Sequence, residues 1–125
     1  MKDPHQYEYK MRRYEDPRGR TSNLLRNARA NAKREGARCT LTFEWILERI
    51  LAGKCEVTRL PFELKRSKIY RAHPFSPSLD RRAAGGDYSP ENTRVVVYAL
   101  NLLRNEYPDM VTRRVARAWL DSKET

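Results

Sequence analysis

The 125-residue sequence contains only two cysteines and two histidines. Cys39 and Cys55 stand far apart, and neither belongs to a Cys-x-x-Cys pair, which excludes a structural zinc site of the paired-cysteine kind. We therefore expect no structural zinc, and two packed thiols in place of a disulfide framework.

Long apolar segments are also missing. The longest uninterrupted one, residues 95–100, is far shorter than the roughly 20 residues that cross a bilayer. The first residues are charged throughout and lack the apolar stretch of a signal peptide. The sequence therefore predicts a cytoplasmic protein without membrane contact, and its length predicts a single domain with a modest core.

Positive charge is what the sequence has in excess. It contains 26 lysines and arginines against 16 acidic residues, which gives a formal net charge of +10. Such an excess favours a polyanionic partner, and nucleic acid first, because each neutralised phosphate releases counterions. Charge alone separates neither DNA from RNA nor an enzyme from a binding protein.

The N-terminal region predicts an arm followed by a helix. Residues 1–20 mix prolines and a glycine with charges of both signs, so we expect a flexible basic arm there and one domain over residues 21–125. A helix is predicted from the Thr21-Ser22 cap to Gly36. Its cations include Arg26, Arg29 and Lys33, which form either a solvated face or a phosphate-binding one.

A second helix is predicted between the cap residue Thr42 and Gly53. Its apolar residues recur at the spacing of one helical face and predict a core contact. Two short extended segments follow, at 55–58 and 61–64. The elements predicted further on are strands at 78–81 and 94–97, a helix from Tyr98 that Pro108 ends, and a last helix capped by Asp109. In that last helix we expect an inward face of Val111, Val115, Ala118 and Trp119.

The strand–loop–strand–helix segment predicts a site for a divalent cation. In this topology the end of the first strand, at Asp80, lies against the helix that carries Asn101. A carboxylate and an amide oxygen are hard ligands that suit Mg²⁺ or Mn²⁺. One such ion can stabilise the charge that develops in phosphodiester cleavage. As alternatives, Asp80 could cap a turn or pair with Arg81 or Arg82, and Asn101 could be an exposed helix residue.

The string PFSPSLDRRAAGGDYSPENTRVVVYALNLLRNE resembles the HNH, or ββα-metal, nuclease motif. The similarity extends upstream through TFEWILERILAGKCEVTRLPFEL, and it is greatest to small phage and prophage proteins described as HNH-like endonucleases. It implies an α+β fold with a ββα-metal core at about 75–107, flanked by N-terminal and C-terminal helices. It also implies a phage-encoded protein of the host cytoplasm.

The resemblance also implies roles for particular residues. Asp80-Arg81 falls on the catalytic Asp-His pair of the family, and Asn101 on its metal-binding helix position. Asn92 falls on the asparagine that braces the loop and the catalytic pair. Arg104 falls where a basic residue often approaches phosphate, and we expect Arg82 to bind nucleic acid as well.

Arginine at position 81 departs from the family pattern. A guanidinium stays protonated and cannot accept a proton from water, so Arg81 would serve as a phosphate clamp. Another group must then activate the water, and the candidates are His73, Tyr88, a metal-bound hydroxide or the substrate phosphate itself. An ordinary loop histidine is the alternative interpretation of His73.

Three functions remain open at this point. The first is a DNA endonuclease or nickase that uses one Mg²⁺ or Mn²⁺ ion and acts on double-stranded in preference to single-stranded DNA. The second is a nucleic-acid-binding protein of HNH-like fold that does not cut. The third is a phage protein that binds a host factor. A homodimer is compatible with each of them.

Overall fold

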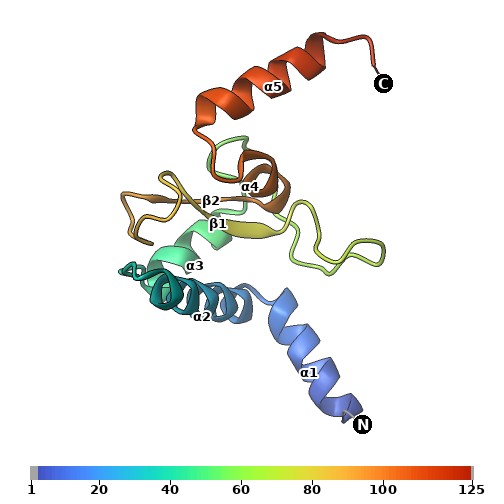
Figure 1. Ribbon diagram of the computed structural model, residues 1–125. Coiled ribbons are helices and arrows are strands. Elements are labelled where there is room, and N and C mark those ends of the chain that lie inside the picture. The colour runs from blue at the N-terminus through green and yellow to red at the C-terminus, as the bar shows by residue number, and fades with distance from the viewer. Residues whose placement is uncertain (1–2, 125) are drawn as a thin grey trace.

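The computed structural model describes residues 3–124. It is an α+β fold, as the sequence predicts, and it has five helices and one two-stranded antiparallel sheet in this range (Figure 1). The elements are α1 (Pro4–Glu15), α2 (Pro17–Glu35), α3 (Phe43–Ala52), β1 (Pro77–Arg81), β2 (Thr93–Val97), α4 (Tyr98–Arg104) and α5 (Asp109–Asp121).

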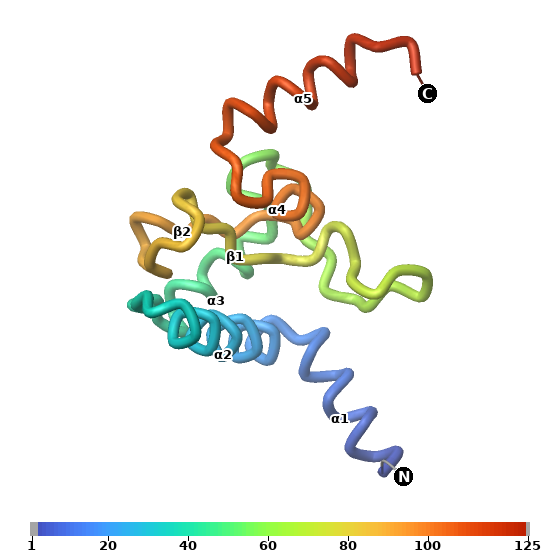
Figure 2. Tube along the Cα trace, viewed as in Figure 1, coloured from blue at the N-terminus to red at the C-terminus, as the bar shows by residue number. Residues whose placement is uncertain are grey.

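The N-terminal region is helical, so the expectation of an irregular arm is wrong over α1 and the start of α2. Pro4 occupies the first turn of α1, where its missing N–H would be unpaired in any case. The side chain of Asp16 accepts a hydrogen bond from the Gly19 N–H at 3.0 Å and caps α2. This helix therefore begins at Pro17 and not at Thr21. No residue of α1 is buried, and α1 projects away from the body of the molecule (Figure 2).

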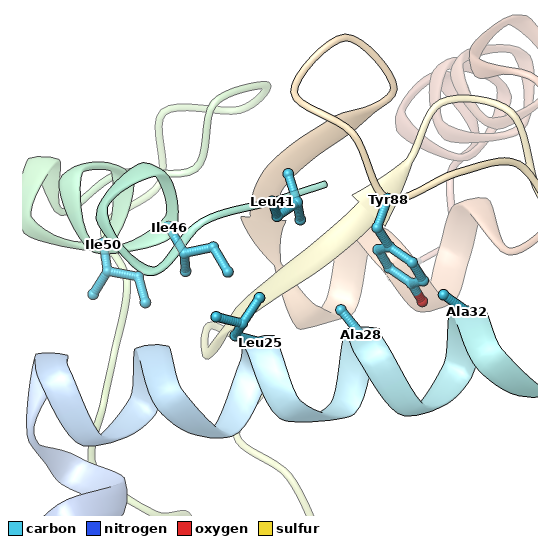
Figure 3. Packing of buried hydrophobic residues seen from close by; sticks show 7 residues of the cluster. All are labelled: Leu25, Ala28, Ala32, Leu41, Ile46, Ile50 and Tyr88. Atoms are coloured by element: carbon cyan, nitrogen blue, oxygen red, sulfur yellow. The ribbon is translucent and has the colours of Figure 1, made fainter. Parts of the chain in front are cut away.

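The larger core lies between α2, α3 and the loop that joins the two strands. Leu25, Ala28 and Ala32 of α2 point toward the rest of the cluster, and Tyr88 of the loop points down onto the two alanines (Figure 3). Because the alanine side chains are small, the tyrosine ring can approach the helix closely. The buried members of this cluster are Leu25, Ala28, Ala32, Leu41, Ile46, Ile50 and Tyr88.

Helix α3 has the predicted boundaries. The Thr42 side chain accepts a hydrogen bond from the Trp45 N–H at 3.1 Å, and Gly53 ends the helix with a φ of 82°. The predicted extended segments at 55–58 and 61–64 form no strand. A single antiparallel bridge involves them in the described chain, and it joins Pro61 to Lys54, the residue before the first segment.

The two strands form a hairpin that runs directly into α4. Asp80 lies opposite Arg94 in the strand register. The Tyr98 N–H donates to the Ser76 carbonyl at 2.8 Å, which fixes the first turn of α4 beside β1. Helix α4 is shorter than expected, because Asn105 adopts a φ of 51° and ends it before Pro108.

Helix α5 has no inward apolar face, so that expectation is wrong. Val111, Val115 and Trp119 are 40%, 53% and 69% exposed, and Thr112 is the buried residue of the helix. Figure 1 shows why: α5 leaves α4 at the edge of the molecule and extends beyond the body, at the opposite end from α1. Within residues 3–124 no helix is both long enough and apolar enough to cross a membrane.

Candidate functional site

The residues predicted to bind metal line one pocket between β1, α4 and the loop after β1. Its volume is about 280 Å³, and Asp80, Arg81, Tyr88 and Asn101 are among its lining residues. The sequence therefore predicts correctly that the end of the first strand lies against the helix that carries Asn101. What the pocket can bind depends on the hydrogen bonds and ion pairs that these side chains already form within the protein.

Asp80 is 2% exposed and is held by two arginines. Arg94 donates from Nη2 to Oδ2 at 2.7 Å, and Arg104 donates from Nη1 to Oδ1 at 2.6 Å. Both carboxylate oxygens therefore accept charge-assisted hydrogen bonds, which are about twice as strong as neutral ones. Asp80 acts as an internal counter-ion that joins β1, β2 and α4.

Asp109 extends this ion network to α5. Its carboxylate accepts from Arg94 Nη1 at 2.9 Å and lies 2.8 Å from Arg104 Nε. The hydrogen bond from Arg94 lowers the pKa of Asp109, and the bonds to Asp109 and Asp80 raise the pKa of Arg94. The four side chains, two of each sign, anchor the first turn of α5 to the hairpin.

Asn101 also has protein partners. Its amide nitrogen donates to Ser78 Oγ at 2.7 Å and to the Leu79 carbonyl at 3.3 Å, which ties α4 to β1. A divalent cation bound to Asp80 would have to replace a guanidinium on a buried carboxylate that two arginines surround. As its side chain lies, Asp80 does not fit a divalent cation, and the Mg²⁺ or Mn²⁺ site at Asp80 and Asn101 stays a prediction. Within residues 3–124 no group of three or more His, Cys, Asp or Glu side chains is placed to hold a metal ion.

Arg81 points into the same pocket but is bound within the protein. Its Nη1 donates to Glu35 Oε2 at 2.7 Å and to the Gly86 carbonyl at 2.9 Å. Its guanidinium carbon lies 4.3 Å from the centre of the Tyr88 ring. The hydrogen bond to Glu35 raises the pKa of Arg81, so the side chain remains a cation. These contacts fasten the hairpin to the end of α2.

Asn92 holds together the loop between the strands. Its Oδ1 accepts from the Ala83 N–H at 3.0 Å, and its Nδ2 donates to the Asp87 carbonyl at 2.9 Å. A Cβ added at Gly86 would lie 2.9 Å from the same amide nitrogen. Position 86 therefore leaves no room for a side chain unless Asn92 moves. Asn92 therefore acts on the loop and not directly on the pocket.

His73 lies outside the pocket. It lines a separate hollow beside α1 together with Tyr14 and Arg66, and its Nδ1 accepts from the Phe75 N–H at 3.1 Å. The arrangement matches an ordinary loop histidine, and the structure does not bring this imidazole to Asp80. The suggestion that His73 activates water at Asp80 has no geometric support.

The predicted nucleic-acid contacts divide into two groups. Arg26, Arg29 and Lys33 are exposed on α2, and none of them forms an ion pair with any residue of the described chain. Arg82 is exposed as well, in the loop after β1. Arg104 is different, because it is 2% exposed and also donates to the backbone carbonyls of Arg81 and Arg82. Arg104 therefore holds the hairpin from within the protein, and its predicted phosphate contact has no geometric support.

Sequence reasoning missed Arg94 and Arg20. The signal for Arg94 was available, since an antiparallel hairpin with these strands places position 94 opposite Asp80, where opposite charges pair. Arg20 is 1% exposed, stacks on Tyr14 at 3.5 Å and donates to Ser76 Oγ and the Leu64 carbonyl. Burial lowers the pKa of Arg20. Nothing in the local sequence marks it as a buried cation.

The comparisons with known proteins identify no relative. No family model matches the chain, and neither a curated protein nor a solved structure is detectably similar to it.

Proposed function

We propose that the protein binds double-stranded DNA through the phosphate backbone, in an HNH-like ββα arrangement used for binding and not for cleavage. The observation that carries this proposal is the row of uncompensated cations on α2. We call Arg26, Arg29 and Lys33 the α2 basic stripe.

The stripe is a consequence of how α2 packs. Leu25, Ala28 and Ala32 are buried against the core. With 3.6 residues per turn, Arg26, Arg29 and Lys33 then share an adjacent face that is exposed. The seven helical steps from Arg26 to Lys33 cover about 10 Å along the helix axis, which is comparable to about three phosphates of one DNA strand.

The lack of ion pairs along the stripe, within residues 3–124, supports the same conclusion. The carboxylates that contact arginines in the described chain are Glu35, Glu56, Asp80 and Asp109, and none of them pairs with a residue of the stripe. No ion pair within residues 3–124 therefore neutralises the three charges of the stripe. A groove of about 600 Å³, which Arg26, Arg29 and Phe43 help to line, runs between the stripe and the start of α3. Backbone binding of this kind needs no particular base sequence.

A binding comparison tests the proposal. The variant Arg26→Gln/Arg29→Gln/Lys33→Gln and the control Lys54→Gln/Lys65→Gln/Lys68→Gln lose the same charge from exposed positions. Fluorescence anisotropy with a labelled duplex should show about tenfold or greater weakening for the stripe variant and a much smaller effect for the control. Equal weakening in both variants would mean that net charge, and not the stripe, carries binding.

Metal-dependent cleavage by a DNA endonuclease or nickase is the second candidate. It is favoured by one observation, namely that Asp80, Arg81 and Asn101 line the same pocket. It would require Asp80 to exchange an arginine for a cation. Supercoiled plasmid incubated with Mg²⁺, Mn²⁺ or EDTA separates the candidates. We expect bound but intact plasmid, whereas metal-dependent nicking that disappears in Asn101→Ala would establish cleavage.

A further inference from the structure

A second polar pocket lies between α3, the start of β2 and the first turn of α5. Its volume of about 550 Å³ falls in the range that holds small organic ligands. Its charged lining residues are four arginines (Arg49, Arg82, Arg94 and Arg113) and two carboxylates (Glu56 and Asp109). The pocket therefore carries an excess of two positive charges, and it shares no residue with the α2 basic stripe.

Two of the four arginines are free to bind a ligand. Arg94 is already bound by Asp80 and Asp109, and Arg49 stacks on Trp45 with its Nε 3.7 Å from Glu56. Arg82 and Arg113 are exposed, and neither forms an ion pair with any residue between 3 and 124. They come from the hairpin loop and from α5, which both line the pocket.

A buried hydroxyl in this pocket gives an independent reason to expect a ligand. Thr93 lines the pocket and is 3% exposed, and its Oγ1 has no hydrogen-bond partner among residues 3–124. Buried polar groups are nearly always paired, so the Thr93 hydroxyl at this pocket indicates an acceptor that is supplied from outside.

We infer that this pocket binds the phosphate group of an organic phosphate. Arginine forks match phosphate oxygens in pairs, and a threonine hydroxyl can donate to a third oxygen. The volume leaves room for a polar group attached to the phosphate. Two sources share this chemistry, a free nucleotide and a phosphate of a nucleic-acid strand. The inference goes beyond the proposed function, because it stands even if the α2 basic stripe binds no DNA.

Calorimetric titration with inorganic phosphate and with adenosine monophosphate tests the inference. The test variants are Arg82→Gln/Arg113→Gln, which removes the free cations, and Thr93→Val, which removes the hydroxyl and keeps the shape of the side chain. Lys65→Gln/Lys68→Gln is the control, since it loses the same charge from exposed positions outside the pocket. We expect the double arginine variant to weaken binding of adenosine monophosphate by about tenfold or more and the control to leave it within about twofold.

The same variants in the duplex-binding assay distinguish the sources. A nucleotide ligand is supported if the double arginine variant loses adenosine monophosphate binding but keeps its affinity for DNA. A nucleic-acid phosphate is supported if both affinities fall together. The inference is overturned if the wild type binds neither phosphate probe, or if the double arginine variant binds both as well as the control does. Neither of these results bears on the stripe, whose own variant tests it separately.

Discussion

At the scale of single residues, the buried ion pairs of Asp80 determine how the hairpin is stabilised and whether it can bind a metal ion. Its carboxylate is buried, and both oxygens are bound by arginines that are themselves 8% exposed or less. Removing Asp80 leaves two buried guanidinium groups with only the half-exposed Asp109 as a counter-ion. The penalty for an unpaired buried charge exceeds the net stabilisation that the intact pair provides.

Replacing Asp80 should therefore cost much more than replacing Asp109, although both contact the same two arginines. We expect Asp80→Asn to lower the free energy of unfolding by about 3–5 kcal/mol. Asp109→Asn should lower it by about 1 kcal/mol or less, because the Asp109 side chain is 48% exposed and solvent screens its ion pairs. Urea unfolding followed by circular dichroism measures both. Equal losses would show that Asp80 is not the central counter-ion.

The pH dependence of stability should report on Asp109. Its folded-state pKa is lowered by Arg94, so its pairing contributes fully above the unfolded-state pKa and is lost as pH falls through the folded-state value. We expect the free energy of unfolding to decline below about pH 4, and the decline to be shallower in Asp109→Asn. Measured unfolding curves with the same slope in both proteins would contradict this contribution.

The position of Asp80 was predictable, and its partners were only partly so. A strand that ends at Asp80 and a helix that carries Asn101 define the pocket from sequence alone. The pairing with Arg94 follows from hairpin register, but Arg104 reaches Asp80 only because α4 turns directly off β2. Whether a carboxylate binds a cation from solution or an arginine from its own chain depends on such long-range placement.

At the scale of elements, α5 is amphipathic but is not packed. Its apolar side chains Val115 and Trp119 are more than half exposed, whereas Ile46 of α3 is fully buried. The buried Thr112 and the ion pairs of Asp109 hold only its first turn. The contribution of α5 to stability should therefore come from its N-terminal end.

Substitutions along the two helices should reflect this difference. Trp119→Ala should change the free energy of unfolding by about 0.5 kcal/mol or less, since an exposed side chain loses few contacts. Ile46→Ala should lower it by about 2–5 kcal/mol, because it leaves a cavity in the core between α2 and α3. Thermal or urea unfolding of the two variants side by side gives the comparison. A loss at Trp119 as large as that at Ile46 would mean that α5 folds back onto the body in solution.

The elements that were predicted well are marked by features of their own local sequence. Helix α3 has a capping threonine and a terminal glycine, and the β-branched run at Val95–Val97 marks β2. Helix α1 was missed because Pro4 and dense charge favour disorder as readily as a helix that starts at proline. The orientation of α5 was missed because periodicity predicts which side chains share a face, and not whether anything covers that face.

At the scale of the whole molecule, internal ion pairs and free cations occupy different places. The acidic residues that form these ion pairs connect the hairpin to α4, to α5 and to the last residue of α2. Along α2, in contrast, the basic stripe is left without a counter-ion in the described chain. This separation links the fold to the proposed function. Arg94 and Arg104 neutralise Asp80 inside the protein, whereas the cations of the basic stripe remain available to phosphate on α2.

The salt dependence of duplex binding tests that claim most directly. The logarithm of the binding constant should fall linearly with the logarithm of salt concentration for the wild type. In Arg26→Gln/Arg29→Gln/Lys33→Gln the slope should flatten by up to about 2.7, which is about 0.9 for each lost phosphate contact. The control Lys54→Gln/Lys65→Gln/Lys68→Gln should keep the wild-type slope. A stripe variant that binds with an unchanged slope would show that α2 does not contact phosphate, and the proposed function would be wrong.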